Sequence, residues 1–94
     1  MLMHGYASDA TTWIDPNWPR VQQYLPLHLF DRGFDVWMAN TRGTKYSQNH
    51  KSLALDDPEY WNFSWAEMGL YDDVANVKMI KEHTGKKVSY VGVS

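Results

Sequence analysis

A long helix is marked at both of its ends within residues 64–85. Ser64 and Glu67 form the pattern Ser-x-x-Glu, in which each side chain caps the backbone N–H of the other residue. Gly85 closes the same stretch, and glycine readily takes the left-handed conformation that ends a helix. The sequence therefore predicts a helix over residues 64–84. Its apolar side chains fall on two opposite faces, which indicates a helix with neighbours on two sides.

Short β-prone runs precede and follow this helix. Three such runs, each bounded by turn residues or by the start of the chain, cover residues 1–3, 34–39 and 87–92. A second, shorter helix is predicted over residues 25–32, with Pro26 in its first turn and Gly33 as its stop. The order strand, helix, strand, helix, strand is typical of an α/β fold with a parallel sheet and crossover helices.

The handedness of the crossovers restricts how the strands are ordered. If the chain crosses one way through the first helix and back through the second, strand 1–3 lies between the other two. The loop at His4-Gly5 and the turn at Ser94 then follow adjacent strands at the same carboxyl edge. Such a switch point is where open α/β sheets place their sites.

The composition fits a folded domain and excludes several classes of protein. The 94 residues fit one small domain or a piece of a larger one, and 44% of them are hydrophobic and 21% charged. A net charge of -2 gives no footprint for nucleic acid or an anionic membrane. The chain has no cysteine, no run near the roughly 20 apolar residues of a membrane span, and no signal-peptide pattern at its start. We therefore expect no nucleic-acid partner, no metal and no cofactor.

Gly92-Val93-Ser94 is the feature that suggests chemistry. Gly-x-Ser directly after a β-prone run begins a nucleophile elbow, which lifts a serine hydroxyl above the sheet. A serine nucleophile also needs a base and N–H donors for an oxyanion. Tyr6, directly after His4-Gly5, offers a backbone N–H at the same edge. From these residues alone, an ordinary polar Ser94 and a tight His4-Gly5 turn without a catalytic role stay open as alternatives.

Other polar residues have assignments of their own. His4 is not expected to be the base, because histidine follows serine in a triad of the elbow type. Arg42 can position either a loop or a carboxylate with its bidentate fork, and Asp72 is a candidate for a buried, hydrogen-bonded carboxylate on the long helix. Asn62-Phe63-Ser64 is a glycosylation sequon whose Ser64 is also the predicted helix cap, so its occupancy stays open. No metal-ligand spacing links the remaining histidines, which are His28, His50 and His83.

Longer motifs in register resemble the acid lipase family. Leu2-Met3-His4-Gly5 with residues 8–13 resembles its oxyanion loop, and residues 33–43 are similar to its G-[YF]-D-V-W-x-x-N-x-R-G segment. Residues 57–68 match D-P-x-[FY]-W-x-F-S-W-x-E-M, and Tyr90-Val91-Gly92-x-Ser94 matches the elbow. The family consists of α/β-hydrolases of the lysosomal acid lipase, gastric lipase and sterol ester hydrolase type.

The resemblance covers essentially the whole chain and implies a partial α/β-hydrolase domain over residues 1–94, truncated at both ends. It implies that Ser94 is the nucleophile and that the Tyr6 N–H, at a position usually held by leucine, is an oxyanion donor. His4 and Gly5 would shape that loop. Val93 departs from the histidine common in the family, and the triad aspartate and histidine are absent from this chain. The tryptophan-rich motif is interpreted as core packing between helix and sheet.

The activity implied for the parent is hydrolysis of neutral-lipid esters, triacylglycerols or sterol esters, through an acyl-enzyme on Ser94. The implied partner is a lipid ester substrate at a lipid–water interface, in a lysosomal, secreted or lipid-droplet setting. We expect the 94 residues alone to be inactive. Two alternatives stay open: a small-ester esterase of the same fold, and a truncated non-catalytic homologue that acts as an interaction protein or has no function.

Overall fold

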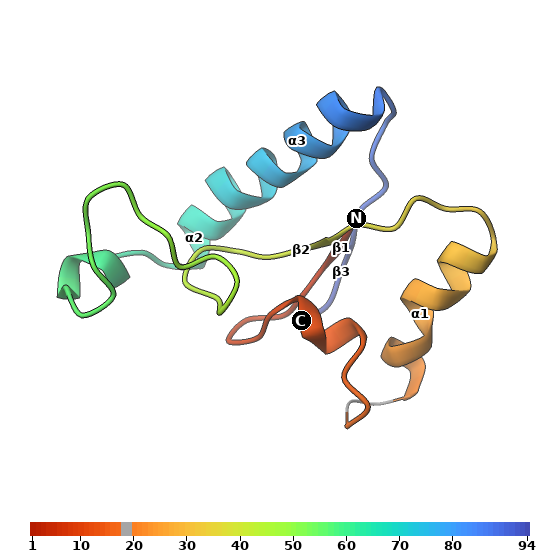
Figure 1. The fold of residues 1–94 in the computed structure, drawn as a ribbon, viewed down its shortest axis with the longest axis horizontal. Helices are drawn as coiled ribbons and strands as arrows, with labels where there is room; N and C mark the ends of the chain where they lie inside the picture. The colour runs from red at the N-terminus through yellow and green to blue at the C-terminus, as the bar shows by residue number, and fades with distance from the viewer. Residues whose placement is uncertain (18–19) are drawn as a thin grey trace.

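Three short parallel strands form the sheet at the centre of the molecule (Figure 1). They are β1 (Leu2–Met3), β2 (Met38–Ala39) and β3 (Val91–Gly92), in the order β2-β1-β3. The computed structural model describes residues 1–17 and 20–94. Leu2 pairs with Met38 and Val91, and Met3 pairs with Ala39 and Gly92. The central position of β1 and the α/β class are thus confirmed.

The strands are shorter than predicted. Only the last two residues of each β-prone run at 34–39 and 87–92 are paired in the sheet, and Met1 lies outside β1. The reason is the central strand: β1 offers two residues for pairing, so each neighbour pairs over two residues. Single hydrogen bonds extend the contact slightly, since the Leu2 N–H donates to the Trp37 carbonyl at 2.7 Å. Composition predicts which residues favour an extended backbone but not whether a partner strand is long enough.

Helix α1 (Arg20–Asp31) begins five residues earlier than the predicted helix at 25–32. Pro26 therefore lies inside the helix rather than in its first turn, where it leaves one backbone hydrogen bond unmade. The predicted stop is confirmed. Gly33 has φ 87°, its N–H donates to the Phe30 carbonyl at 2.9 Å, and the Phe34 N–H donates to the Leu29 carbonyl at 3.1 Å. This pair of bonds is the Schellman motif.

The predicted helix at 64–84 is confirmed as one continuous helical stretch with an irregular middle. It runs through α2 (Trp65–Glu67), the π-helical turn η3 (Met68–Asp73) and α3 (Val74–Thr84) (Figure 1). Both halves of the Ser64–Glu67 capping box are present, and Gly85 ends α3 with φ 69°. The π turn was not predicted. A π turn inserts an extra residue and shifts the register of the side chains that follow it.

Two short 3₁₀ helices, η1 (Ala10–Trp13) and η2 (Pro58–Trp61), lie in the loops after β1 and β2. The core is small and gathers around β1, where Leu2, Met3, Trp13, Ala39, Tyr60 and Ile80 are buried. Trp13 is the largest of these, with 2% of its surface exposed. The interpretation of the tryptophan-rich motif as core packing is wrong for two of its members, because Trp61 is 47% and Trp65 76% exposed.

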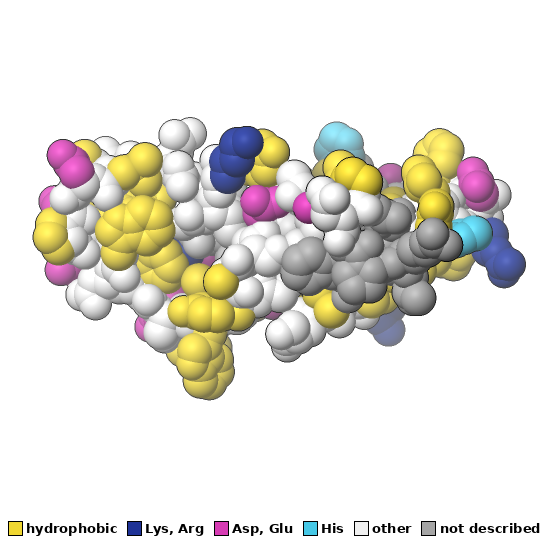
Figure 2. All heavy atoms as spheres, turned by 90° about the horizontal axis from the view of Figure 1, so that it is seen from below, with side chains coloured by type: hydrophobic (Ala, Val, Ile, Leu, Met, Phe, Trp, Pro, Cys, Tyr) yellow, Lys and Arg dark blue, Asp and Glu magenta, His cyan; other side chains and the backbone are white. Residues whose placement is uncertain are grey.

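The outer helical faces carry apolar side chains that contact little. Leu27 and Phe30 on α1, and Leu70 and Val74 on the long helix, are exposed. Figure 2 shows hydrophobic side chains in separate groups along the face that it presents. The predicted neighbours on two sides of the long helix are not found among the described residues, because apolar side chains such as Leu70 and Met79 stay exposed. Within residues 1–17 and 20–94, no helix combines the length and the apolar character needed to cross a bilayer.

Candidate active-site cleft

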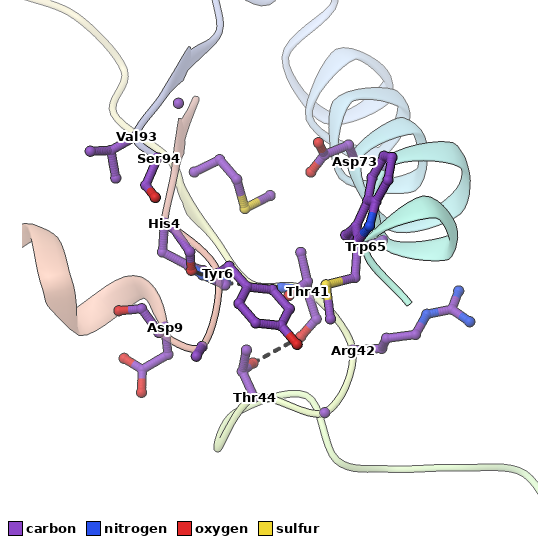
Figure 3. Close-up of a pocket in the computed structure, with 18 of the residues that line it drawn as sticks. His4, Tyr6, Asp9, Thr41, Arg42, Thr44, Trp65, Asp73, Val93 and Ser94 are labelled. Carbon is purple, nitrogen blue, oxygen red and sulfur yellow. Dashed lines mark hydrogen bonds between the residues drawn. The ribbon is translucent and has the colours of Figure 1, made fainter. Parts of the chain in front are cut away.

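A cleft of about 1040 Å³ opens at the carboxyl edge of the sheet. The segments that follow β1, β2 and β3 form one side of it, and the first turns of the long helix form the other. Figure 3 shows Ser94 and His4 on the sheet side, with Trp65 and Asp73 on the helix across from them. The topology therefore brings His4, Gly5 and Tyr6 into the same cleft as Ser94, as the sequence predicted.

Ser94 has the backbone of a sharp turn. It follows β3 by two residues and has φ 53°, a left-handed value that non-glycine residues rarely adopt. The contact with the β1 loop is close: a Cβ atom added to Gly5 would lie 3.0 Å from the Ser94 Cβ and 3.2 Å from the Val93 carbonyl oxygen. Only glycine allows the two segments to approach this closely. The requirement for Gly5 therefore comes from the serine turn itself.

His4 is a buried bridge between two loops. Its Nε2 accepts a hydrogen bond from the Thr41 N–H at 3.3 Å, and its Nδ1 lies 2.8 Å from the Gly5 carbonyl oxygen. An accepting Nε2 leaves the proton on Nδ1, which donates to Gly5. With both ring nitrogens engaged, His4 has no lone pair free for a serine proton. The expectation that His4 shapes the loop rather than acting as base agrees with this geometry.

The Tyr6 backbone is available for an incoming ligand. Its N–H donates to no acceptor in the part of the chain that the structure describes. The loop beyond it is held by Asp9, whose carboxylate accepts from the Thr11 N–H at 2.8 Å and the Thr11 hydroxyl at 2.6 Å. These bonds lower the pKa of Asp9 below its usual value. Ser8 and Thr12 also share a hydrogen bond between their hydroxyls.

Asn40 connects the β1 loop to the long helix. Its Oδ1 accepts from the Ala10 N–H at 2.9 Å, and its carbonyl accepts from Asn76 Nδ2 at 3.1 Å. The side chain and the backbone of one residue thus tie two different elements to the end of β2. This role of Asn40 was not predicted, because no local sequence signal links residues 30 and 36 positions apart.

Arg42 and Asp72 form a bidentate pair at the far side of the cleft. Arg42 Nε lies 2.9 Å and Nη2 2.7 Å from Asp72 Oδ1, and the Arg42 backbone N–H donates to Oδ2 at 2.9 Å. The side chain of Asp72 is 14% and that of Arg42 37% exposed. Hydrogen bonding to Asp72 raises the pKa of Arg42 still further. The prediction of a bidentate carboxylate partner for Arg42 and a largely buried Asp72 is confirmed.

Aromatic rings complete this wall. A Cβ atom added to Gly43, which has φ 80°, would lie 2.8 Å from Phe63 Cζ and 3.1 Å from Trp61 Cζ3. The Arg42 guanidinium lies 5.8 Å from the Phe63 ring centre and 5.7 Å from that of Tyr71. Gly43 is therefore the point where the loop after β2 packs directly beneath the rings. The aromatic rings thus form an apolar wall of the cleft, and the Arg42 guanidinium, paired with Asp72, lies against them.

A second carboxylate of the π turn also reaches the cleft. The Tyr90 hydroxyl donates to Asp73 Oδ2 at 3.0 Å, and the other carboxylate oxygen of Asp73 is buried without a partner. Burial first, and then Asp73, raises the pKa of Tyr90 to about 12. The Tyr90 ring lies close enough to Gly92 that a Cβ there would be 3.0 Å away. The pair was not predicted, although adjacent Asp72 and Asp73 on a helix were a visible signal.

The remaining histidines lie away from the cleft. His50 accepts hydrogen bonds from the Ser52 and Leu53 N–H groups, and His83 packs edge-on against Trp37 at 5.5 Å. Among the described residues, no three His, Asp or Glu side chains are placed to hold a metal ion. Among the described residues, the cleft therefore presents a serine, an N–H without an acceptor and an aromatic wall, and the histidine that lines it, His4, is already engaged.

Curated proteins align with this chain along its whole length, whereas no family model matches it. Lipase member M of Mus musculus is 46% identical over 95 aligned positions, and triacylglycerol lipase 2 of Arabidopsis thaliana is 42% identical. The alignment with each covers 100% of this chain and 22% of the relative. Lysosomal acid lipase/cholesteryl ester hydrolase of Homo sapiens is 40% identical over 94 positions, which cover 99% of this chain and 23% of the relative.

These relatives carry the names that the motifs predicted, and the matched region contains every motif described above. The chain spans less than a quarter of the length of each relative. Taken with the parallel sheet, this alignment confirms the resemblance: over its whole length the chain is similar to a segment of members of the acid lipase family.

Proposed function

We propose that this chain carries the nucleophile and one oxyanion donor of a serine carboxylic-ester hydrolase that acts on neutral lipids. The observation that supports this most directly is the left-handed turn at Ser94, packed against Gly5 at the carboxyl edge of the sheet. A serine forced into this backbone conformation projects from the end of a strand, where a substrate can reach its hydroxyl.

In the proposed reaction, Ser94 Oγ attacks the ester carbonyl carbon while a base takes its proton. The Tyr6 N–H, which has no acceptor among the described residues, donates to the oxyanion that forms. Collapse of the tetrahedral intermediate releases the alcohol and leaves an acyl group on Ser94. Water then hydrolyses the acyl-enzyme by the same steps. The replacement of leucine by Tyr6 leaves this role intact, because the donor belongs to the backbone.

No described histidine of the cleft is free to act as a base for Ser94. His4 is the histidine that lines the cleft, and both of its nitrogens are bonded to backbone groups. We therefore propose that the 94 residues alone hydrolyse no ester above background, and that catalysis requires an aspartate and a histidine supplied by a longer chain of this family.

We infer the substrate class from the relatives, whose names specify triacylglycerol or cholesteryl esters. The aromatic wall around Gly43 fits an apolar acyl or sterol group better than a polar one. A small-ester esterase would use the same nucleophile, so chain-length preference separates the two. The lipid–water interface is the setting in which such esters are encountered.

A chimera tests this proposal. Residues 1–94 would replace the corresponding segment of human lysosomal acid lipase, to which they are 40% identical. We expect the chimera to hydrolyse p-nitrophenyl esters and to prefer long over short acyl chains. Ser94→Ala should lower kcat on the order of 10⁶-fold, the size seen when a serine protease loses its nucleophile. The isolated chain should show no turnover.

Ser89→Ala is the matched control, because Ser89 is exposed in the same β-prone run and its side chain makes no described contact. It should leave kcat unchanged. A folded chimera in which Ser94→Ala retains full activity would contradict the nucleophile assignment. A folded but inactive chimera would instead support the non-catalytic homologue, and a preference for short esters would support the esterase.

A further inference from the structure

Asn62-Phe63-Ser64 lies at the rim of the cleft and takes no part in the proposed chemistry. Asn62 follows η2 as its C-terminal cap and is exposed. It occupies a tight turn, in which the Phe63 N–H donates to the Trp61 carbonyl at 2.8 Å. We propose that Asn62 is a site of N-linked glycosylation, an inference that does not depend on the role of Ser94.

The side chain of Asn62 is held only loosely. Its Nδ2 donates to Glu59 Oε1 at 2.9 Å, and both groups are exposed. Water readily replaces a hydrogen bond between a neutral amide and an exposed carboxylate. This bond therefore does little to oppose modification of Asn62. Asn62 is exposed, and a glycan requires such a surface position.

The hydroxyl of the sequon is, by contrast, fully used in the folded chain. Ser64 Oγ donates to Glu67 Oε2 at 2.7 Å and accepts from the Ala66 N–H at 3.2 Å. The sequon hydroxyl is thus free only before the capping box forms. Transfer to Asn62 therefore belongs to the period when the long helix has not yet closed. The completed cap and the attached glycan are compatible, because they use different side chains.

The chemistry is a redox-neutral glycosyl transfer from a lipid-linked oligosaccharide pyrophosphate. A bond forms between Asn62 Nδ2 and the anomeric carbon of the first sugar. The bond between that carbon and the pyrophosphate oxygen breaks, and the amide proton is lost as the lipid pyrophosphate leaves. The product places a polar glycan next to Trp61 and close in sequence to Trp65, two side chains that are exposed at the cleft rim.

The test is translation of the full chain behind a cleavable signal sequence in the presence of microsomes. We expect a mass increase that an endoglycosidase removes, and Asn62→Gln should abolish it completely. Ser64→Thr should retain it, because threonine serves both the sequon and the cap. The chain contains no other Asn-x-Ser/Thr sequon, so a single step in mass is expected.

Ser64→Asp separates the sequon from the cap. Aspartate remains a good N-cap but lacks the hydroxyl that the sequon needs. This variant should lose the glycan while its helical circular dichroism stays equal to that of the unmodified chain. An unmodified wild-type chain in microsomes would overturn the proposal, as would a glycan that persists in Asn62→Gln.

Discussion

The carboxyl edge of the sheet and the outer helical faces are held in opposite ways. At the edge, loops far apart in sequence are joined by specific hydrogen bonds: His4 to Thr41, Asn40 to Ala10, and Arg42 to Asp72. On the outer faces, apolar side chains such as Phe30 and Val74 are exposed, and the described ion pair is the loose Lys78–Glu82 contact at 4.0 Å.

This difference shows which part of the molecule has its geometry fixed by specific contacts. The cleft is built from paired polar groups and glycines in close contact, each of which tolerates few alternatives. The outer helical faces carry exposed apolar side chains, and these side chains make few specific contacts. The site is therefore the better determined part of the molecule, although it consists mostly of loops.

The largest contrast is expected between Trp13 and Phe30. Trp13→Ala removes a ring that is 2% exposed and should cost about 3 to 5 kcal/mol of unfolding free energy. Phe30→Ala removes a ring that is 69% exposed and should change it by no more than about 0.5 kcal/mol. Urea denaturation followed by circular dichroism measures both. Equal costs would show that the exposed helical face contributes as much as the core.

Gly43 and Gly33 form the next pair, since both have positive φ and only one is crowded. Gly33→Ala meets no atom within 4 Å and should cost about 1 to 2 kcal/mol for the left-handed backbone alone. Gly43→Ala adds a contact of 2.8 Å with Phe63 and should cost about 1 to 3 kcal/mol more. Hydrogen exchange of the Gly43 and Ser47 amides reports the local effect. If Gly43→Ala costs no more unfolding free energy than Gly33→Ala, the Phe63 and Trp61 rings move aside easily.

The two regions also differ in the expected strength of their described ion pairs, Arg42–Asp72 and Lys78–Glu82. Arg42→Lys loses the bidentate fork and should cost about 1.5 to 3 kcal/mol, because a largely buried Asp72 keeps fewer partners. Lys78→Ala removes an exposed contact and should cost less than about 0.5 kcal/mol. Both are read from urea denaturation at low and high salt. A stronger salt dependence of the Lys78–Glu82 pair is expected, and the reverse order of costs would contradict the comparison.

The sequence predicted the parts that depend on local signals or on motifs spanning many residues. The Ser64 cap, the Gly33 and Gly85 stops and the central position of β1 were all correct. Strand length was wrong because it depends on a distant partner. The start of α1 was wrong because the helix begins before Pro26 and accepts the loss of one backbone hydrogen bond there.

Contacts within the candidate site divide in the same way. The approach of His4-Gly5 to Ser94 followed from topology. A carboxylate partner for Arg42 and a buried Asp72 followed from side-chain chemistry, but that the two form a pair was not predicted. The links through Thr41, Asn40 and Asn76 did not follow, because they depend on backbone groups whose orientation is set only when the sheet has formed. The π turn escaped prediction because its composition is that of an ordinary helix.

The smallest expected effect concerns alkaline pH. Tyrosine becomes charged by losing a proton, and the pKa of Tyr90 rises from its ordinary 10.0 to about 12 in the folded chain. The folded state therefore holds this proton more tightly than the unfolded state. The contribution of Tyr90 to stability is fully present below pH 10 and is lost as the pH rises through about 12. Because Tyr90 is half-exposed, solvent screening keeps this contribution small.

Tyr90→Phe should remove that part of the alkaline loss while leaving the neutral-pH structure unchanged, since the ring still packs on Gly92. Tyr24→Phe is the matched control, because Tyr24 is similarly exposed but lies on α1, away from any carboxylate contact described for it. Absorbance at the tyrosinate band and urea denaturation at pH 9 to 12 measure the two variants. If the Tyr90 hydroxyl ionises near its ordinary pKa of 10.0, neither its burial nor its bond to Asp73 persists in solution, and the polar network of the cleft ends at Arg42 and Asp72.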